Sequence, residues 1–387
     1  MSRAPRSNSG FSLVELMIAM TIGLLLLAGL VMIFVNSSEA NRELQKTAQQ
    51  IENGRYAVDV VSQDLRLAGF YGHIHELNNI AMPGMIPPDP CVSALGAALT
   101  SSLRFPVQGY RGSVHATTPV SDAPANVSST SCTALSTANL RPGSDVLVIR
   151  RADTNPLGAV DITTTNAFYI QATSSALEIQ LGGGAAIGNC PSANEHCKAD
   201  GATPSALKLA NGAAPAPSAP IRRLRVHVYF VAPCSIPNGG GTVCTGTSDD
   251  GGRPIPTLKR LELTSSGTIT IVPMVEGIEY FKVEYGVDTA PSSVNVNTGY
   301  IGDGTVDSYS QAPADWTTVI AAKIYLLARN TEPTQGFTDT KTYLLGSAAA
   351  TDNIAVPAAA GSEARYKRHV YTAAVQLVNS AGRREIP

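Results

Sequence analysis

The chain has 387 residues with nearly balanced charge, 28 basic against 30 acidic, and only 15% of its residues are charged. This balance, without blocks of like charge, excludes a protein that binds nucleic acid through a basic surface. With 34 glycines and 25 prolines, the composition also excludes a collagen-like chain and a low-complexity disordered one.

An apolar run of 25 residues begins at Phe11 and ends at Val35, and Glu15 is its single charged residue. As a helix it would rise about 37 Å, at 1.5 Å per residue, which is enough to cross a bilayer. A carboxylate at the centre of a membrane span costs roughly 2.5 to 3.5 kcal/mol and usually marks function. We therefore predict a transmembrane helix over residues 11–35 and a functional role for Glu15.

Residues 1–10 form a short polar leader whose only charged side chains are Arg3 and Arg6. A secretory signal places its apolar stretch before the cleavage point, whereas this leader has none, so the apolar span would survive processing after Gly10. The positive-inside rule places the leader in the cytoplasm and the residues beyond the span outside it.

The helix is expected to continue over residues 36–69 as an amphipathic segment, because apolar side chains recur at intervals of three, four or seven. Gly54 interrupts this segment at a cost of about 1 kcal/mol. The apolar stripe, which is expected to pack on the head, consists of Leu44, Ala48, Ile51, Val58, Val61, Leu65 and Ala68. The exposed face is expected to carry Glu43, Lys46, Gln50, Asp59 and Gln63. A separate partner-binding surface along the stripe is the alternative.

Residues 70–387 are predicted to form an extracytoplasmic, β-rich head. Strand-like segments cover residues 145–150, 177–181, 224–230, 257–263, 268–272, 280–285, 319–327 and 369–378. The strand at 224–230 is expected to be half-buried, with Arg225, His227 and Tyr229 on its polar face. Long insertions lie at 90–142, 182–220, 233–256, 290–313 and 331–361. The predicted fold class is α+β, a long N-terminal helix packed on an antiparallel sheet with long disulfide-bearing loops.

All six cysteines lie beyond the span, where an oxidising compartment favours disulfides. Six cysteines allow 15 connectivities, and we expect neighbours to pair. The expected pairs are Cys190 with Cys197, Cys234 with Cys244, and Cys91 with Cys132. Each bridge would stabilise its loop by about 2 to 4 kcal/mol. A zinc site using Cys190, His196 and Cys197 is the alternative, although this spacing matches no usual ligand set.

Few other residues suggest chemistry. Asp303 and Asp307 match part of a calcium loop, but the terminal bidentate glutamate is missing. His73 and His75 would suit a metal if they lay on one strand. The sequence contains no nucleophile elbow, metalloprotease motif or phosphate-binding loop. We therefore expect neither catalysis nor a cofactor.

The run Gly10-Phe-Ser-Leu-Val-Glu15, followed by a long apolar helix, resembles the N-terminus of type IV prepilins. The resemblance implies cleavage between Gly10 and Phe11 by a prepilin peptidase and methylation of the new Phe11 amine. It also implies retention in the inner membrane of a Gram-negative bacterium until assembly. A carboxylate in lipid needs a cation, so we expect Glu15 to pair with the Phe11 amine of its own or an adjacent subunit. Alternatively, Glu15 snorkels to the cytoplasmic headgroups.

Several segments of the chain resemble the PilW group of minor pilins. They are residues 52–57, 64–70, 275–279, 284–288, 303–309, 324–329 and 366–371. The resemblance implies a low-abundance subunit near the pilus tip that helps prime assembly. The implied partners are FimU-, PilV- and PilX-type minor pilins, the major pilin and a PilY-type adhesin. A minor pseudopilin of a type II secretion system and a tip-located adhesin are the alternatives.

Overall fold

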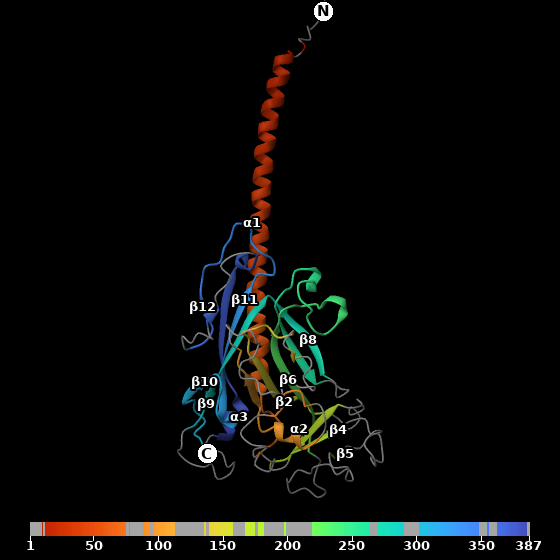
Figure 1. Cartoon of the computed structure of the whole chain (residues 1–387), viewed down its shortest axis with the longest axis vertical. Helices are drawn as coiled ribbons and strands as arrows, with labels where there is room; N and C mark the ends of the chain where they lie inside the picture. The colour runs from red at the N-terminus through yellow and green to blue at the C-terminus, as the bar shows by residue number, and fades with distance from the viewer. Residues whose placement is uncertain are drawn as a thin grey trace, which may run out of the picture. The chain divides into compact units, whose positions relative to one another are not determined.

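The computed structural model describes residues 10, 12–74, 77, 88–92, 96–112, 135–136, 139–157, 167–174, 177–181, 197–198, 219–263, 269–289, 302–347, 354–355 and 362–384. The chain divides into two compact units, residues 1–49 and 50–387. Helix α1 (Leu13–Leu67) is the first element and runs through both (Figure 1). All described β-strands lie in the second unit, which we call the head.

Helix α1 has 55 residues and ends just before Gly69. Gly69 takes φ +74°, a left-handed conformation that glycine adopts without steric cost and that commonly ends helices. Its N–H then donates to the Arg150 carbonyl at 2.9 Å, which ties the end of the helix to the sheet. Two short helices follow, α2 (Ala97–Ser102) and α3 (Val378–Arg384).

The first sheet has eight antiparallel strands in the order β1-β2-β6-β3-β4-β5, with β7 paired to β6 and β8 paired to β7. Its strands are β1 (Val107–Tyr110), β2 (Val146–Ala152), β3 (Phe168–Ala172), β4 (Leu177–Leu181), β5 (Cys197–Lys198), β6 (Ile221–Ala232), β7 (Thr257–Leu263) and β8 (Ile269–Glu276). The second sheet has four antiparallel strands in the order β10-β9-β11-β14. Its strands are β9 (Ile278–Val287), β10 (Ser308–Ser310), β11 (Val319–Arg329) and β14 (Arg368–Gln376).

Two smaller kinds of element complete the described head. A two-stranded sheet pairs β12 (Tyr343–Leu344) with β13 (Ile354–Ala355). Short 3-10 turns lie at η3 (Asn238–Gly240), η4 (Asp249–Gly251), η5 (Trp316–Thr318) and η7 (Ser362–Arg365). The α+β fold class is confirmed, and each of the eight predicted strands is present. Sequence alternation did not predict β1, β3, β5, β10, β12 or β13, which have two to five residues each.

The head has two main apolar cores, one on each face of the eight-stranded sheet. Along β2, Leu147 and Ile149 belong to the core shared with α1 and the four-stranded sheet, whereas Val146 and Val148 belong to the other core. Strand β6 alternates in the same way. Because both faces are covered, the prediction of a half-buried strand at 224–230 is wrong.

The face of α1 that packs on the head differs from the predicted stripe. Leu44, Ala48 and Ile51 are exposed, whereas Val61 and Leu65 are buried as predicted. Gln50, predicted to be exposed, is only 6% exposed. Its side-chain Nε2 donates to the carbonyls of residues 328 and 367 at 2.9 and 3.0 Å. These two hydrogen bonds remove the cost of burying an amide, so a polar residue occupies a core-facing position.

Candidate functional site

Glu15 lies in the first turn of α1 and helps to cap it. Ser12 is the residue before the helix, and its backbone N–H donates to Glu15 Oε2 at 2.9 Å. The Val14 N–H donates in turn to Ser12 Oγ at 3.4 Å. This reciprocal arrangement is a capping box, which satisfies N–H groups that have no partner inside the helix. Gly10 is described, whereas Phe11, on the other side of the predicted junction, lies outside the described residues.

The first part of α1 presents a continuous apolar surface. Every residue from Leu13 to Val35 is exposed. The hydroxyl of Thr21, a polar group in this stretch, donates to main-chain carbonyls at 2.9 and 3.1 Å. Within the described part of the chain, α1 is the one helix long and apolar enough to cross a membrane. An apolar surface this long is unfavourable in water, so it needs lipid or the apolar helices of other subunits around it.

A buried carboxylate connects α1 to the eight-stranded sheet. Asp64, 5% exposed, accepts from Arg151 Nε at 2.6 Å and from the Tyr229 hydroxyl at 2.9 Å, and its Oδ2 lies 2.5 Å from His227 Nδ1. Burial by itself raises the pKa of Asp64. His227 and Arg151 more than offset burial, so the pKa lies well below its ordinary value. The site therefore holds a charged carboxylate that orients the end of the helix.

A second buried network connects β9 to β14 and to nearby loops. Glu279, 3% exposed, accepts from Arg141 Nη2 at 2.8 Å and from Arg368 Nη2 at 3.2 Å. Arg368 Nη1 also donates to Asp339 Oδ2 at 3.2 Å. Burial alone raises the pKa of Glu279, but Arg141 and Arg368 lower it below its ordinary value. Glu279 and Arg368 lie in two of the segments that resemble PilW proteins. In these two segments, the residues that carry the resemblance include ion pairs that hold the head together.

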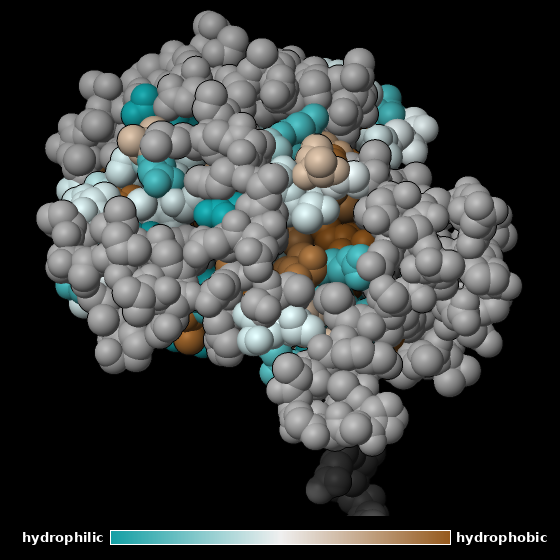
Figure 2. Space-filling model, turned by 90° about the horizontal axis from the view of Figure 1, so that it is seen from below, coloured by the Kyte–Doolittle hydropathy of each residue, from teal (hydrophilic) through white to brown (hydrophobic). Residues whose placement is uncertain are grey.

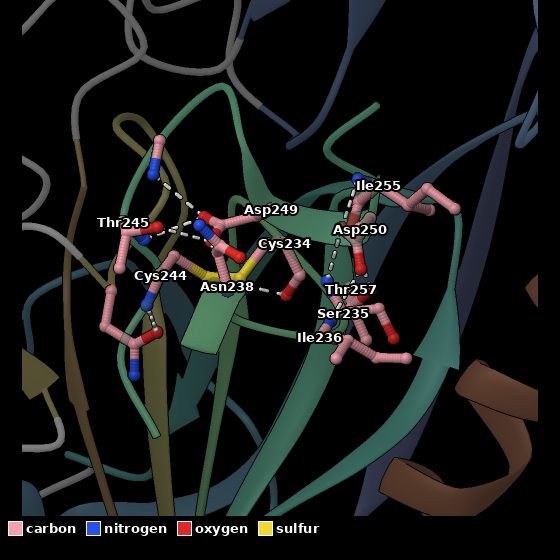
Figure 3. Close-up of a disulfide and its surroundings, with 12 residues drawn as sticks. Cys234, Ser235, Ile236, Asn238, Cys244, Thr245, Asp249, Asp250, Ile255 and Thr257 are labelled. Atoms are coloured by element: carbon pink, nitrogen blue, oxygen red, sulfur yellow. Dashed lines mark hydrogen bonds between the residues drawn. A yellow bond between two sulfur atoms is a disulfide. The ribbon is translucent and has the colours of Figure 1, made fainter. Parts of the chain in front are cut away.

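The disulfide between Cys234 and Cys244 closes a surface loop (Figure 3). This is one of the expected pairs, and its Cα atoms are 5.8 Å apart. Five residues beyond Cys244, Asp249, 1% exposed, accepts from the backbone N–H groups of Asn238 and Thr245, each at 2.7 Å, and from the Thr245 hydroxyl at 2.6 Å. Burial by itself raises the pKa of Asp249, but these donors lower it to about 2.

The next residue, Asp250, fixes the base of the same loop. Its carboxylate accepts from the backbone N–H groups of Ser235 at 3.0 Å, Ile236 at 2.6 Å and Ile255 at 2.8 Å (Figure 3). Asp250 takes φ +51°, and among the described residues it is the only non-glycine with positive φ. Hydrogen bonds to these two neighbouring carboxylates, in place of an apolar core, therefore hold residues 235–255 together.

The other cysteine expectations remain predictions. Cys91 is disulfide-bonded and 2% exposed. Its expected partner Cys132 lies outside the described residues, as does Cys190, and of Cys197 only the backbone in β5 is described. The alternative zinc site with His196 falls on the same undescribed stretch.

In the structure, Asp303 and Asp307 make hydrogen bonds within their loop. Asp303 Oδ1 accepts from the Thr305 N–H at 2.9 Å and from its hydroxyl at 2.6 Å. Asp307 Oδ2 accepts from the Thr289 N–H at 2.7 Å. Neither carboxylate belongs to a group of three or more potential metal ligands among the described side chains. Calcium binding at Asp303 and Asp307 remains a prediction, and these hydrogen bonds do not favour it.

The same loop is held by a different carboxylate, which sequence reasoning missed. Asp288 is fully buried and accepts from the Gly304 N–H at 3.0 Å and from Arg384 Nε at 2.9 Å. Arg384 belongs to α3, so this ion pair connects the C-terminal helix to the loop. A buried carboxylate needs such partners.

Metal binding has little support elsewhere in the described part of the chain. Cys234, Cys244 and Asp249 lie close enough to share an ion, but both sulfurs are consumed by the disulfide. His73 is exposed, and His75, its predicted companion, lies outside the described residues.

Exposed apolar side chains are scattered over the described head surface. The large ones are Ile51, Tyr56, Ile236, Tyr309, Leu344 and Val378. In the view from below, the described surface is mainly polar or neutral, with a small apolar area (Figure 2). The extended apolar surface therefore belongs to the first part of α1.

Two family models match the chain. The model described as "Type IV Pilus-assembly protein W" (PilW) matches residues 243–379, and the model described as "Prokaryotic N-terminal methylation motif" matches residues 5–31. No curated protein matches. Among solved structures, the chain is similar to the type IV-like pilin TTHA1219 from Thermus thermophilus. That match has 12% identity and a TM-score of 0.22, and it covers 57% of this chain and 90% of that one.

A methylation motif at the start of an exposed apolar helix, with the same helix continuing into a head of antiparallel β-sheets, is the arrangement expected of a type IV pilin. The PilW match covers the C-terminal part of the head, including β9, β11 and β14. Together the two matches support a PilW-type pilin.

Proposed function

We propose that this PilW-type pilin is a minor subunit that helps prime type IV pilus assembly and sits at or near the pilus tip. The proposal rests on the position of Glu15. It is a carboxylate on an otherwise apolar exposed helix surface, and Ser12 N–H is its one hydrogen-bond donor among the described residues. Its Oε1 atom is free to accept from a cation of another subunit.

The proposed sequence of events follows from this chemistry. A prepilin peptidase cleaves between Gly10 and Phe11 while the helix is held in the inner membrane and the head faces the periplasm, and the new Phe11 amine is methylated. Glu15 then pairs with a Phe11 amine of its own or a neighbouring subunit, so that docking replaces an isolated charge in lipid with an ion pair. The partners are the major pilin, minor pilins of the FimU, PilV and PilX types, and a PilY-type adhesin.

The test uses a strain that lacks this chain and is complemented with Glu15→Leu or with Glu52→Gln as a matched control. Glu52 is an exposed carboxylate of the same helix, outside the apolar run. We expect electron microscopy to show pili with wild type and with the Glu52 variant. We expect few or no pili, and poor recovery of the other minor pilins, with the Glu15 variant. Unchanged incorporation of Glu15→Leu contradicts the pairing.

The phenotype of the deletion strain separates the proposed role from its two alternatives. Loss of surface pili supports the priming role. Normal pili together with blocked protein secretion point to a minor pseudopilin of a type II secretion system. Normal pili together with lost surface attachment point to an adhesin.

A further inference from the structure

The described strands at the ends of the two main sheets are protected to different degrees. Three of them are short: β1, β5 and β10 have four, two and three residues. The eight-residue β8 contains Pro273, which has no N–H, and its pairing with β7 is interrupted by a register shift. Short length, proline and bulges are the usual means of preventing unwanted pairing at a sheet edge.

Strand β14 has none of these features. It has nine residues without proline, and all nine pair with β11 in one unbroken register. Because β14 is the last strand of the four-stranded sheet, its second edge has no strand partner among the described residues.

The register shows which backbone groups face this free edge. The N–H of Leu377 donates to the Ile320 carbonyl, and the N–H of Asn330 donates to the Lys367 carbonyl. In an antiparallel pair the hydrogen-bonded residues alternate along the strand, so odd-numbered residues of β14 bond to β11. The backbone groups that point to the free edge are those of Val370, Thr372, Ala374 and Gln376. Among the described residues, these backbone groups have no hydrogen-bond partner outside the strand.

The side chains around the edge indicate what would fit it. On the outer face Thr372, Ala374 and Gln376 are small or neutral and exposed. On the face toward α1, the rings of His369 and Tyr371 meet edge to face with centroids 4.8 Å apart, and Arg55 follows Gly54, which lies against the Tyr371 ring. Arg55 and His369 are exposed, and neither forms an ion pair with a described side chain.

We propose that the free edge of β14 pairs with an extended segment of a different protein subunit, and that this segment places a carboxylate next to Arg55 and His369. Main-chain hydrogen bonds would supply affinity, and the basic side chains would select the partner. A second copy fits less well, because antiparallel pairing of β14 with itself would direct two α1 helices in opposite directions. The inference rests on the proposed function for the source of the segment, another pilus subunit.

The test compares Thr372→Pro with Thr372→Ala in the full-length chain, co-expressed with the other minor pilins. The Thr372 N–H faces the free edge, so proline removes a donor for the partner and leaves the β11 ladder intact. Alanine changes the side chain and retains the N–H. A second blocking variant, Ala374→Lys, places a charge at the edge. Thermal unfolding of the purified variants confirms that each one folds.

We expect the minor-pilin complex to be recovered with wild type and Thr372→Ala, and at least tenfold less with Thr372→Pro and Ala374→Lys. Hydrogen exchange of residues 368–376 should slow in the complex relative to the chain alone, while exchange of β8 stays unchanged. Normal recovery with both blocking variants, or unchanged exchange in β14, overturns the proposal. If those variants assemble normally while Glu15→Leu fails, the edge proposal is wrong and the priming function stands. If the deletion strain makes normal pili, the priming function is wrong.

Discussion

The ring of Tyr371, on β14, lies directly against Gly54 of α1, where a Cβ atom would overlap it. Glycine in a helix interior costs about 1 kcal/mol relative to alanine, so the sequence alone marks Gly54 as a weak point. In the structure this residue allows the helix and the four-stranded sheet to approach closely.

We predict that Gly54→Ala destabilises the head by about 1 to 3 kcal/mol, because overpacking outweighs the gain in helix propensity. Urea unfolding of the full chain in detergent, followed by fluorescence of the single tryptophan, Trp316, measures the change. Trp316 belongs to the core that α1 and both main sheets share. Combining Gly54→Ala with Tyr371→Ser should restore part of the loss. Equal effects of Gly54→Ala in both backgrounds would contradict steric overlap.

Asp64→Asn should lower stability by about 3 kcal/mol. The substitution removes the charge that pairs with Arg151 and faces His227, and breaking a buried ion pair leaves its partner uncompensated. Asp59→Asn, on the exposed face of the same helix, is the control and should stay within about 0.5 kcal/mol of wild type. Equal effects of the two substitutions would show that the network contributes little.

The lowered pKa of Asp249 predicts how the stability of the fold depends on pH in acid. Its pKa is about 2 in the folded chain, below the ordinary value near 4, so the folded state binds protons less readily than the unfolded state. The stabilisation is therefore complete above about pH 4 and is lost as pH falls toward 2. After allowance for solvent screening it should amount to about 1 kcal/mol. Asp249→Asn should flatten this part of the stability profile, and a profile unchanged by the substitution contradicts the assignment.

Replacing Cys234 and Cys244 together with serine should cost about 3 kcal/mol, the loop-closure value for a bridge with a sequence separation of 10. Thermal unfolding with and without reductant measures the effect. The double variant should become less sensitive to reductant, and a variant that responds as strongly as wild type contradicts a large contribution from this bridge.

Removing calcium should leave the unfolding temperature unchanged, because the carboxylates of Asp303 and Asp307 accept hydrogen bonds from neighbouring threonines. Thermal unfolding in chelator and in excess calcium provides the comparison, with Asp303→Asn as control. A calcium-dependent rise that Asp303→Asn abolishes would restore the calcium site.

The sequence predicted the features that depend on local periodicity. Strand alternation located the long strands, and the span from Phe11 to Val35 is long and apolar enough to be recognised by composition. The Cys234 and Cys244 pair followed from short separation. None of these inferences requires knowledge of which residues meet in space.

The helix face was predicted less well because burial there depends on distant partners. Ile51 was assigned to the core by its apolar character, yet Gln50 is the residue that packs, through hydrogen bonds to two carbonyls that lie 278 and 317 positions away. Asp64, which the sequence analysis did not single out, could have been found there, because an acidic residue between the buried positions Val61 and Leu65 requires a cation. Its partners, on two strands, could not be identified without the fold.

The capping box at Ser12 and Glu15 has a consequence for maturation. Both residues lie on the carboxyl side of the proposed junction, and the helix begins only at Leu13. Removal of the leader would therefore leave the first helical hydrogen bonds in place. The peptidase would receive a substrate whose membrane segment has already reached its final secondary structure. Cleavage would create a new amine next to a helix that keeps its hydrogen bonds.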